Sequence, residues 1–171
     1  MTEGAINISR IDPPMLSRVL RVIGPAILAA RIVHAAEVQF RSDNWFTECE
    51  TTFQLSDREC SIIGVFGVTL PNGRKGAFSL LIDLKNRRVA VVGKPDPTKA
   101  RIHVDKNPPL ECTGTPYCIF SELDTDAVLR ELKDGSVILI DVDTAKSSFQ
   151  MSLSTAGYRA GLAKIQAQTL Q

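Results

Sequence analysis

Short apolar segments rich in β-branched residues, separated by turn residues, most constrain the fold of this chain of 171 residues. The strongest is the run at 60–70, which ends at Pro71-Asn72-Gly73, a typical turn sequence. Short strands at such regular spacing, without βαβ alternation, are typical of a β-sandwich or barrel. The predicted strands lie within 40–52, 60–70, 77–84, 88–92, 100–104, 136–142 and 149–154, with proline-rich loops at 94–98 and 107–115.

Two helices interrupt the strand pattern, one near 124–134 and one near 155–169. Acidic Asp124 and Asp126 favour the N-terminal end of the first helix, and Gly135 is a typical stop. The sequence therefore predicts a mainly β protein, a sandwich or barrel-like single domain with two helices. The apolar residues at helical spacing are Val128, Leu129 and Leu132 in the first helix and Tyr158, Leu162 and Ile165 in the second.

The composition is that of one folded domain. The chain is 44% hydrophobic and 23% charged, which excludes a disordered or low-complexity chain. Its 20 Lys and Arg nearly balance its 19 Asp and Glu. A net charge of +1 provides no basic surface for nucleic acid or an anionic membrane, so we expect neither partner.

The segment that begins at Met15 is typical of an export signal. Two arginines and no acid precede an apolar run at 22–30, and small or β-branched residues at Val33 and Ala35 fit a cleavage site after residue 35. We therefore expect an export signal over 1–35 and one domain over 36–171. Residues 1–14 precede the pattern, as they would if the start codon were assigned too early and translation began at Met15.

Two alternatives for this segment are less favourable. A membrane span needs about 20 apolar residues, whereas Arg21 and Arg31 bracket only nine. An amphipathic helix packed on the domain would carry Pro25 in its interior, at a cost of about 3 kcal/mol. The expected location is the periplasm or cell envelope, or outside the cell, with no stable membrane span after the signal is removed.

Four cysteines, Cys49, Cys60, Cys112 and Cys118, follow the export segment. An even number in an exported chain indicates disulfides. Three connectivities are possible and the residues alone do not choose; two local bridges are the simplest, each stabilising by roughly 2–3 kcal/mol. Zinc pairs usually lie two to four residues apart, unlike these, and free thiols remain the alternative for a cytosolic chain.

Motifs that carry chemistry are largely missing from the sequence. His103 is the only histidine left after signal removal, which excludes two-histidine metal sites, and no serine lies in a G-x-S-x-G motif. Asp141 and Asp143 are explained as the end of a strand, and Trp45 as a core residue. We therefore assign no catalytic residue, no cofactor and no metal site, and expect a protein that is not an enzyme.

The order of residues over 40–168 resembles the bacterial invasion associated locus B family. Trp45 stands four residues before Cys49, Cys60 follows, and the second cysteine pair comes after a proline-rich segment. The other features that carry the resemblance are the turn at 70–73, Leu81-Ile82-Asp83, the set Leu123, Leu129, Leu132, Lys133 and Gly135, the strand at 149–154, and a closing helix that begins near Gly157-Tyr158 and carries Ala160 and Leu162.

The resemblance implies an exported protein of the periplasm or envelope with a β-sandwich-like body. The cysteines match the positions where the family has disulfides, which implies the pairs Cys49–Cys60 and Cys112–Cys118. The family's name links it to host-cell invasion and virulence, and it supplies no catalytic residues. The expected partner is an unidentified protein of the envelope or of a host cell.

Three functional hypotheses follow. The first is a non-enzymatic exported binding or envelope module that acts through a surface near 107–116. The second is an exported enzyme of unrecognised type that uses His103 with Asp105 or acids at the strand ends. The third is a cytosolic structural or assembly protein with free thiols and an uncleaved N-terminal helix. Apolar strands such as 62–70 face either the core or another subunit, and periodicity does not decide between them.

Overall fold

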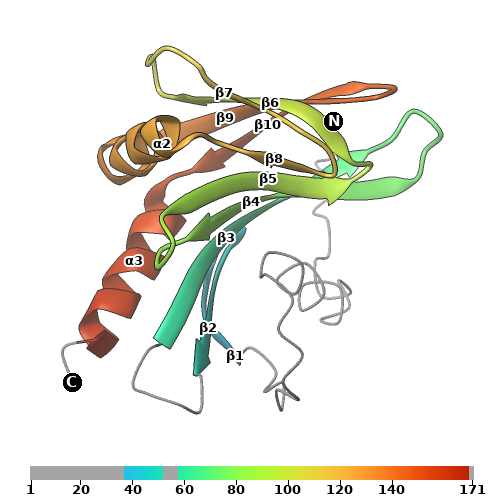
Figure 1. Ribbon diagram of the computed structural model, residues 1–171. Helices are drawn as coiled ribbons and strands as arrows, with labels where there is room; N and C mark the ends of the chain where they lie inside the picture. The colour runs from blue at the N-terminus through green and yellow to red at the C-terminus, as the bar shows by residue number, and fades with distance from the viewer. Residues whose placement is uncertain (1–36, 52–57, 170–171) are drawn as a thin grey trace, which may run out of the picture.

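The computed structural model describes residues 37–51 and 58–169, which form a β-sandwich with two helices (Figure 1). Two antiparallel sheets make up the described chain, so the prediction of a mainly β, sandwich-like single domain is confirmed. The expected export segment at 1–35 lies outside the described residues. None of the described helices combines the length and the apolar character that a membrane crossing requires.

The larger sheet has six strands in the order β1-β2-β3-β4-β5-β8. The predicted strand region at 40–52 is in fact a hairpin, because the chain turns at Asp43, which adopts a positive φ of 52°. The strands are β1 (Glu37–Ser42), β2 (Trp45–Thr51), β3 (Arg58–Thr69), β4 (Lys75–Asp83), β5 (Arg88–Lys94) and β8 (Tyr117–Ile119).

The smaller sheet has four strands in the order β10-β9-β6-β7. The prediction of a loop throughout 107–115 is wrong, because four of these residues pair with β6 as β7. The predicted loop at 94–98 is likewise divided between the ends of β5 and β6. The strands are β6 (Pro97–Val104), β7 (Leu110–Thr113), β9 (Val137–Thr144) and β10 (Ser148–Ser154).

The main core lies between the two sheets and beneath both helices. Alternate residues of each strand point inward, as a half-buried sheet requires. Their burial provides the largest favourable contribution to folding. The most deeply buried of these side chains are Ile62, Phe78, Leu80, Ile82, Val89 and Val91 from the larger sheet, Ile102, Ile138 and Ile140 from the smaller one, and Val128 and Leu132 from the first helix.

Helix α2 (Glu122–Asp134) begins two residues before its predicted start. Ser121 is its N-cap, and the Ser121 hydroxyl accepts a hydrogen bond from the Asp124 amide at 3.2 Å. The helix ends at Gly135 as predicted, where a Cβ would stand 2.2 Å from a Val104 methyl. Close packing against β6, rather than a left-handed backbone, therefore requires glycine at this position.

Helix α3 (Ala156–Thr169) confirms the predicted C-terminal helix and packs on β1, β2 and β3. Trp45 lies beneath its first turn, is 1% exposed, and donates its indole N–H to the Ser154 carbonyl at 2.8 Å. The ring centroids of Trp45 and Tyr158 lie 5.9 Å apart. Burial raises the pKa of the Tyr158 hydroxyl above its ordinary value of about 10. The prediction that Trp45 is a core residue is confirmed.

Candidate functional site

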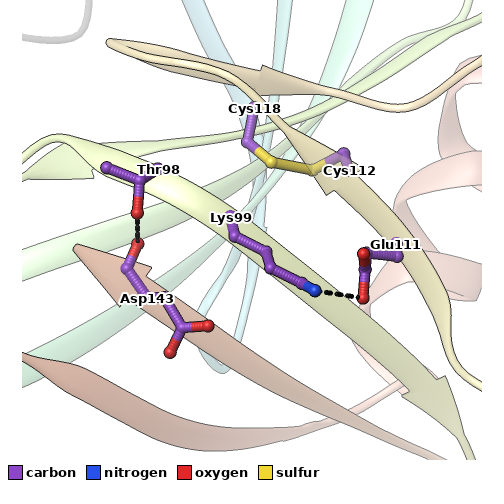
Figure 2. The surroundings of a disulfide bond; sticks show 6 residues. All are labelled: Thr98, Lys99, Glu111, Cys112, Cys118 and Asp143. Atoms are coloured by element: carbon purple, nitrogen blue, oxygen red, sulfur yellow. Dashed lines mark hydrogen bonds and ion pairs between the residues drawn. A yellow bond between two sulfur atoms is a disulfide. The ribbon is translucent and has the colours of Figure 1, made fainter. Parts of the chain in front are cut away.

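Two disulfides join neighbouring cysteines along the chain, in the pairing that the family resemblance implies. Cys49 and Cys60 face each other across β2 and β3. Cys112 of β7 is bonded to Cys118 of β8, as Figure 2 shows. The described part of the chain has no free cysteine.

The Cys112–Cys118 disulfide links the two sheets at their edges. β7 is an edge strand of the smaller sheet and β8 is an edge strand of the larger one. Both half-cystines are buried within the main core, with Cys118 fully inaccessible. The bond therefore fixes this side of the sandwich and holds the segment that connects the two strands.

Residues 105–116, which we call the tethered loop, are held at two points. Asp105 has a positive φ of 53°, and its carboxylate accepts hydrogen bonds from the backbone amides of Ser136 and Val137, both at 3.0 Å. Cys112 holds the other part through its disulfide. Most of the remaining residues of the tethered loop are exposed to solvent. They are Lys106, Asn107, Pro108, Pro109, Glu111, Thr113, Thr115 and Pro116.

The outer face of the smaller sheet, beside the tethered loop, carries charges of both signs. Lys99 of β6 forms an ion pair with Glu111 of β7 at 2.7 Å (Figure 2). The neighbouring Arg101 lies 3.8 Å from an Asp143 carboxylate oxygen on β9. These side chains are about one third to one half exposed, so each pair contributes about 0–1 kcal/mol. The result is a polar, charge-balanced surface.

Of the acids that the enzyme hypothesis offers to His103, the structure places Asp141 beside it and engages Asp105 elsewhere. Asp105 binds backbone amides at the start of β9, whereas His103 lies 3.6 Å from the Asp141 carboxylate. Asp141 also accepts a hydrogen bond from the Gln150 side chain at 2.8 Å. His103 therefore belongs to a row of paired charged side chains on the outer face of the smaller sheet, which we call the polar ladder. Its members are Lys99, Arg101, His103, Glu111, Asp141 and Asp143.

Groups of three or more His, Cys, Asp or Glu side chains placed to hold a metal ion do not occur within the described ranges. The acids of the polar face are instead engaged by the cations and amides of adjacent strands. Ser148 donates its hydroxyl to Asp143 at 2.6 Å, and Thr98 donates to the Asp143 carbonyl at 3.1 Å (Figure 2). These hydrogen bonds connect β9 to both of its neighbours, β10 and β6.

Sequence reasoning missed the polar ladder and the role of Asp105. The spacing of Lys99, Arg101 and His103 at every second residue indicates one face of a strand, and Asp141 and Asp143 repeat in the same way. The pairing of β6 with β9, which brings these side chains together, is a property of the fold that the spacing of residues in the sequence does not show. The contact of Asp105 with β9 carries no local signal, because the partners are 31 and 32 residues away.

Comparison of the chain with protein-family models, with curated proteins and with solved structures finds no match. The resemblance to the invasion associated locus B family therefore stays a prediction from the residues. What the described chain establishes is a disulfide-linked β-sandwich whose tethered loop is fixed at Asp105 and at Cys112.

Proposed function

We propose that this protein is an exported, non-enzymatic binding or interaction protein of the bacterial periplasm or envelope, similar to invasion-associated proteins. The observation that carries the proposal is the pair of disulfides, Cys49–Cys60 and Cys112–Cys118. Such bonds persist in oxidising compartments and are rare in the cytosol. The sequence pattern of an export signal before the domain supports the same compartment.

The tethered loop is the binding surface on this proposal. Fixing a loop before it meets its partner lowers the entropy lost on binding, and this loop is fixed by Asp105 and Cys112. Its exposed residues combine three prolines with one basic and two acidic side chains. A surface of this mixed character is suited to the polar surface of a folded protein rather than to a strongly charged polymer.

The first experiment is the intact mass of the protein isolated from its native cells, alkylated with and without prior reduction. A mass that begins near Ala36, with four thiols alkylated only after reduction, is the expected result. A full-length mass with four freely alkylated thiols would overturn export and favour the cytosolic assembly hypothesis.

A pair of variants tests where the surface lies. Replacing residues 106–109 by Gly-Ser-Gly-Ser keeps Asp105 and both disulfides, and is expected to abolish chemical cross-links to envelope proteins in intact cells. The matched control His103→Gln changes the adjacent polar face and is expected to leave those cross-links unchanged. The reverse pattern, with cross-links lost only in His103→Gln, would contradict the assignment of the surface to the loop.

A further inference from the structure

A second apolar cluster lies on the outer face of the six-stranded sheet, apart from the main core. Ile63, Val65 and Leu81 form it, with exposed fractions of 2%, 6% and 8%. The register places Ile63 opposite Phe46 and Leu81, and the same row continues through Ala90 to Ile119. We call these five residues, Phe46, Ile63, Leu81, Ala90 and Ile119, the outer row.

Strands β3 and β5 of the larger sheet are apolar on both faces. In β5 the four consecutive residues Val89, Ala90, Val91 and Val92 are all buried. Continuous apolar runs of this kind are typical of strands that are covered on both sides, whereas a strand with one solvated face alternates. The strand composition therefore requires a cover over Ile63, Leu81 and Ala90, whereas Ile119 at the end of the row is 45% exposed.

The described elements that pack on this sheet lie on its other face. Gly157 and Gly161 bring α3 against Trp45 and Thr47, whose side chains point away from the outer row. The smaller sheet and α2 share the main core. The described hydrophobic side chain packed against Ile63, Val65 and Leu81 is Phe46, which belongs to the same outer face.

Ile63, Val65 and Leu81 are buried this deeply only if residues outside the described ranges cover them. The chain supplies a suitable one, because residues 22–30 form an uncharged apolar run that precedes β1. β1 begins at Glu37 and is the edge strand of this same sheet. From β1 to β4 is three strand spacings, roughly 14 Å, and the six residues 31–36 can span up to about 20 Å.

We propose that residues 22–30 dock on the outer face of the six-stranded sheet, over Ile63, Val65 and Leu81, and form a third layer while they remain attached. Nine extended residues reach roughly 30 Å, more than the four strand spacings, roughly 19 Å, that separate the ends of the outer row. Burial of apolar surface on both partners drives the contact, and residues 22–30 carry no charge. The charged neighbour at one end of the row is Arg41, whose guanidinium lies 5.0 Å from the centroid of the Phe46 ring.

This inference goes beyond the proposed function and depends on it in one respect. If cleavage after residue 35 removes the segment, the outer row becomes the open apolar surface of the mature domain. Apolar patches of this kind mark protein-interaction sites. The tethered loop and the outer row would then be two separate surfaces, on different sheets of the sandwich.

The test uses the full chain, refolded under oxidising conditions with methyl-labelled Ile, Leu and Val. The expected result is nuclear Overhauser contacts from the Ile27 and Leu28 methyls to those of Ile63 and Leu81. The inner-face neighbour Ile62 is the internal control and shows no such contact. Contacts that appear only between differently labelled copies would overturn the proposal in favour of a dimer, and contacts with neither face would overturn it outright.

A double substitution in the apolar run at 22–30 provides a second measurement. Ile27→Asp with Leu28→Asp is expected to increase the fluorescence of a hydrophobic dye severalfold and to leave the disulfides intact. The matched control, Ile6→Asp with Ile8→Asp, adds the same charge outside the apolar run and is expected to leave the fluorescence unchanged. Equal responses from the two variants would contradict docking. Neither result depends on export, which the intact mass of the native protein tests separately.

Discussion

Gly157 lies against the indole ring of Trp45, so closely that a Cβ at this position would stand 2.4 Å from Cδ1 and 2.8 Å from Cγ. The same indole donates its N–H to the Ser154 carbonyl. The ring therefore joins β2 to the end of β10 and to the first turn of α3. A C-terminal helix with little amphipathic character is thus held by a specific backbone approach to one aromatic side chain.

Replacement of Gly157 by Ala should lower the free energy of unfolding by about 1–3 kcal/mol. Alanine favours a helix by about 1 kcal/mol, but the contact with Trp45 leaves no room for its methyl group. Urea denaturation of the mature domain measures the effect. The exposed position Gln166→Ala on the same helix is the control and should change stability by less than about 0.5 kcal/mol. A Gly157→Ala variant as stable as the control would show that the close approach is absent.

Removal of the Cys112–Cys118 disulfide by alanine substitution of both residues should cost about 2 kcal/mol of stability. The bond closes a short loop, with a sequence separation of 6, so the gain from restricting the unfolded chain is modest. Hydrogen exchange of amides in 105–116 should also accelerate, because β7 and β8 lose their link. Alanine substitution of Cys49 and Cys60 is the comparison and should leave exchange in 105–116 unchanged.

Asp105→Ala should lower the free energy of unfolding by about 1–3 kcal/mol, because the Ser136 and Val137 amides lose a charged acceptor and alanine disfavours the positive φ. Asp105→Asn keeps one acceptor oxygen and a side chain that tolerates this backbone, so it should lose less. Thermal unfolding of the two variants at equal ionic strength measures the difference. Losses below about 0.5 kcal/mol in both variants would mean that the carboxylate contacts contribute nothing.

Tyr158 should make the protein less stable above pH 10. Burial raises the pKa of the folded hydroxyl, so above pH 10 the unfolded chain releases a proton that the folded chain retains. The stabilisation is complete below pH 10 and is lost as the pH rises through the folded pKa. Tyr158→Phe should remove this part of the pH dependence in denaturant titrations from pH 8 to pH 11. A pH dependence identical to that of the wild-type protein would show that the hydroxyl is not responsible.

The sequence alone predicted the elements whose apolar residues follow a clear period. The run at 60–70 is β3, the prediction of a stop at Gly135 is confirmed, and Trp45 is buried. Each of these is encoded by residues that are close together in the chain. The apolar content of β3 on both faces was visible as well, although periodicity did not show which face is the core.

The parts that were missed depend on contacts between distant residues. β7 and β8 have only four and three residues, and they lie in a proline-rich stretch that resembles a loop. No local pattern around Gly157 reveals that the C-terminal helix approaches Trp45. The polar ladder likewise requires the pairing of β6 with β9 across more than thirty residues.

Both disulfides join cysteines that are consecutive in the chain, and this has a consequence for how the protein acquires them. If the protein is exported as proposed, the polypeptide emerges from a translocation pore N-terminus first and presents Cys49 and then Cys60, well before the second pair. An oxidant that bonds each thiol to the next one available therefore produces the native connectivity directly. Maturation by this route needs a thiol oxidant and no disulfide isomerase, and so avoids reshuffling steps that take seconds to hours.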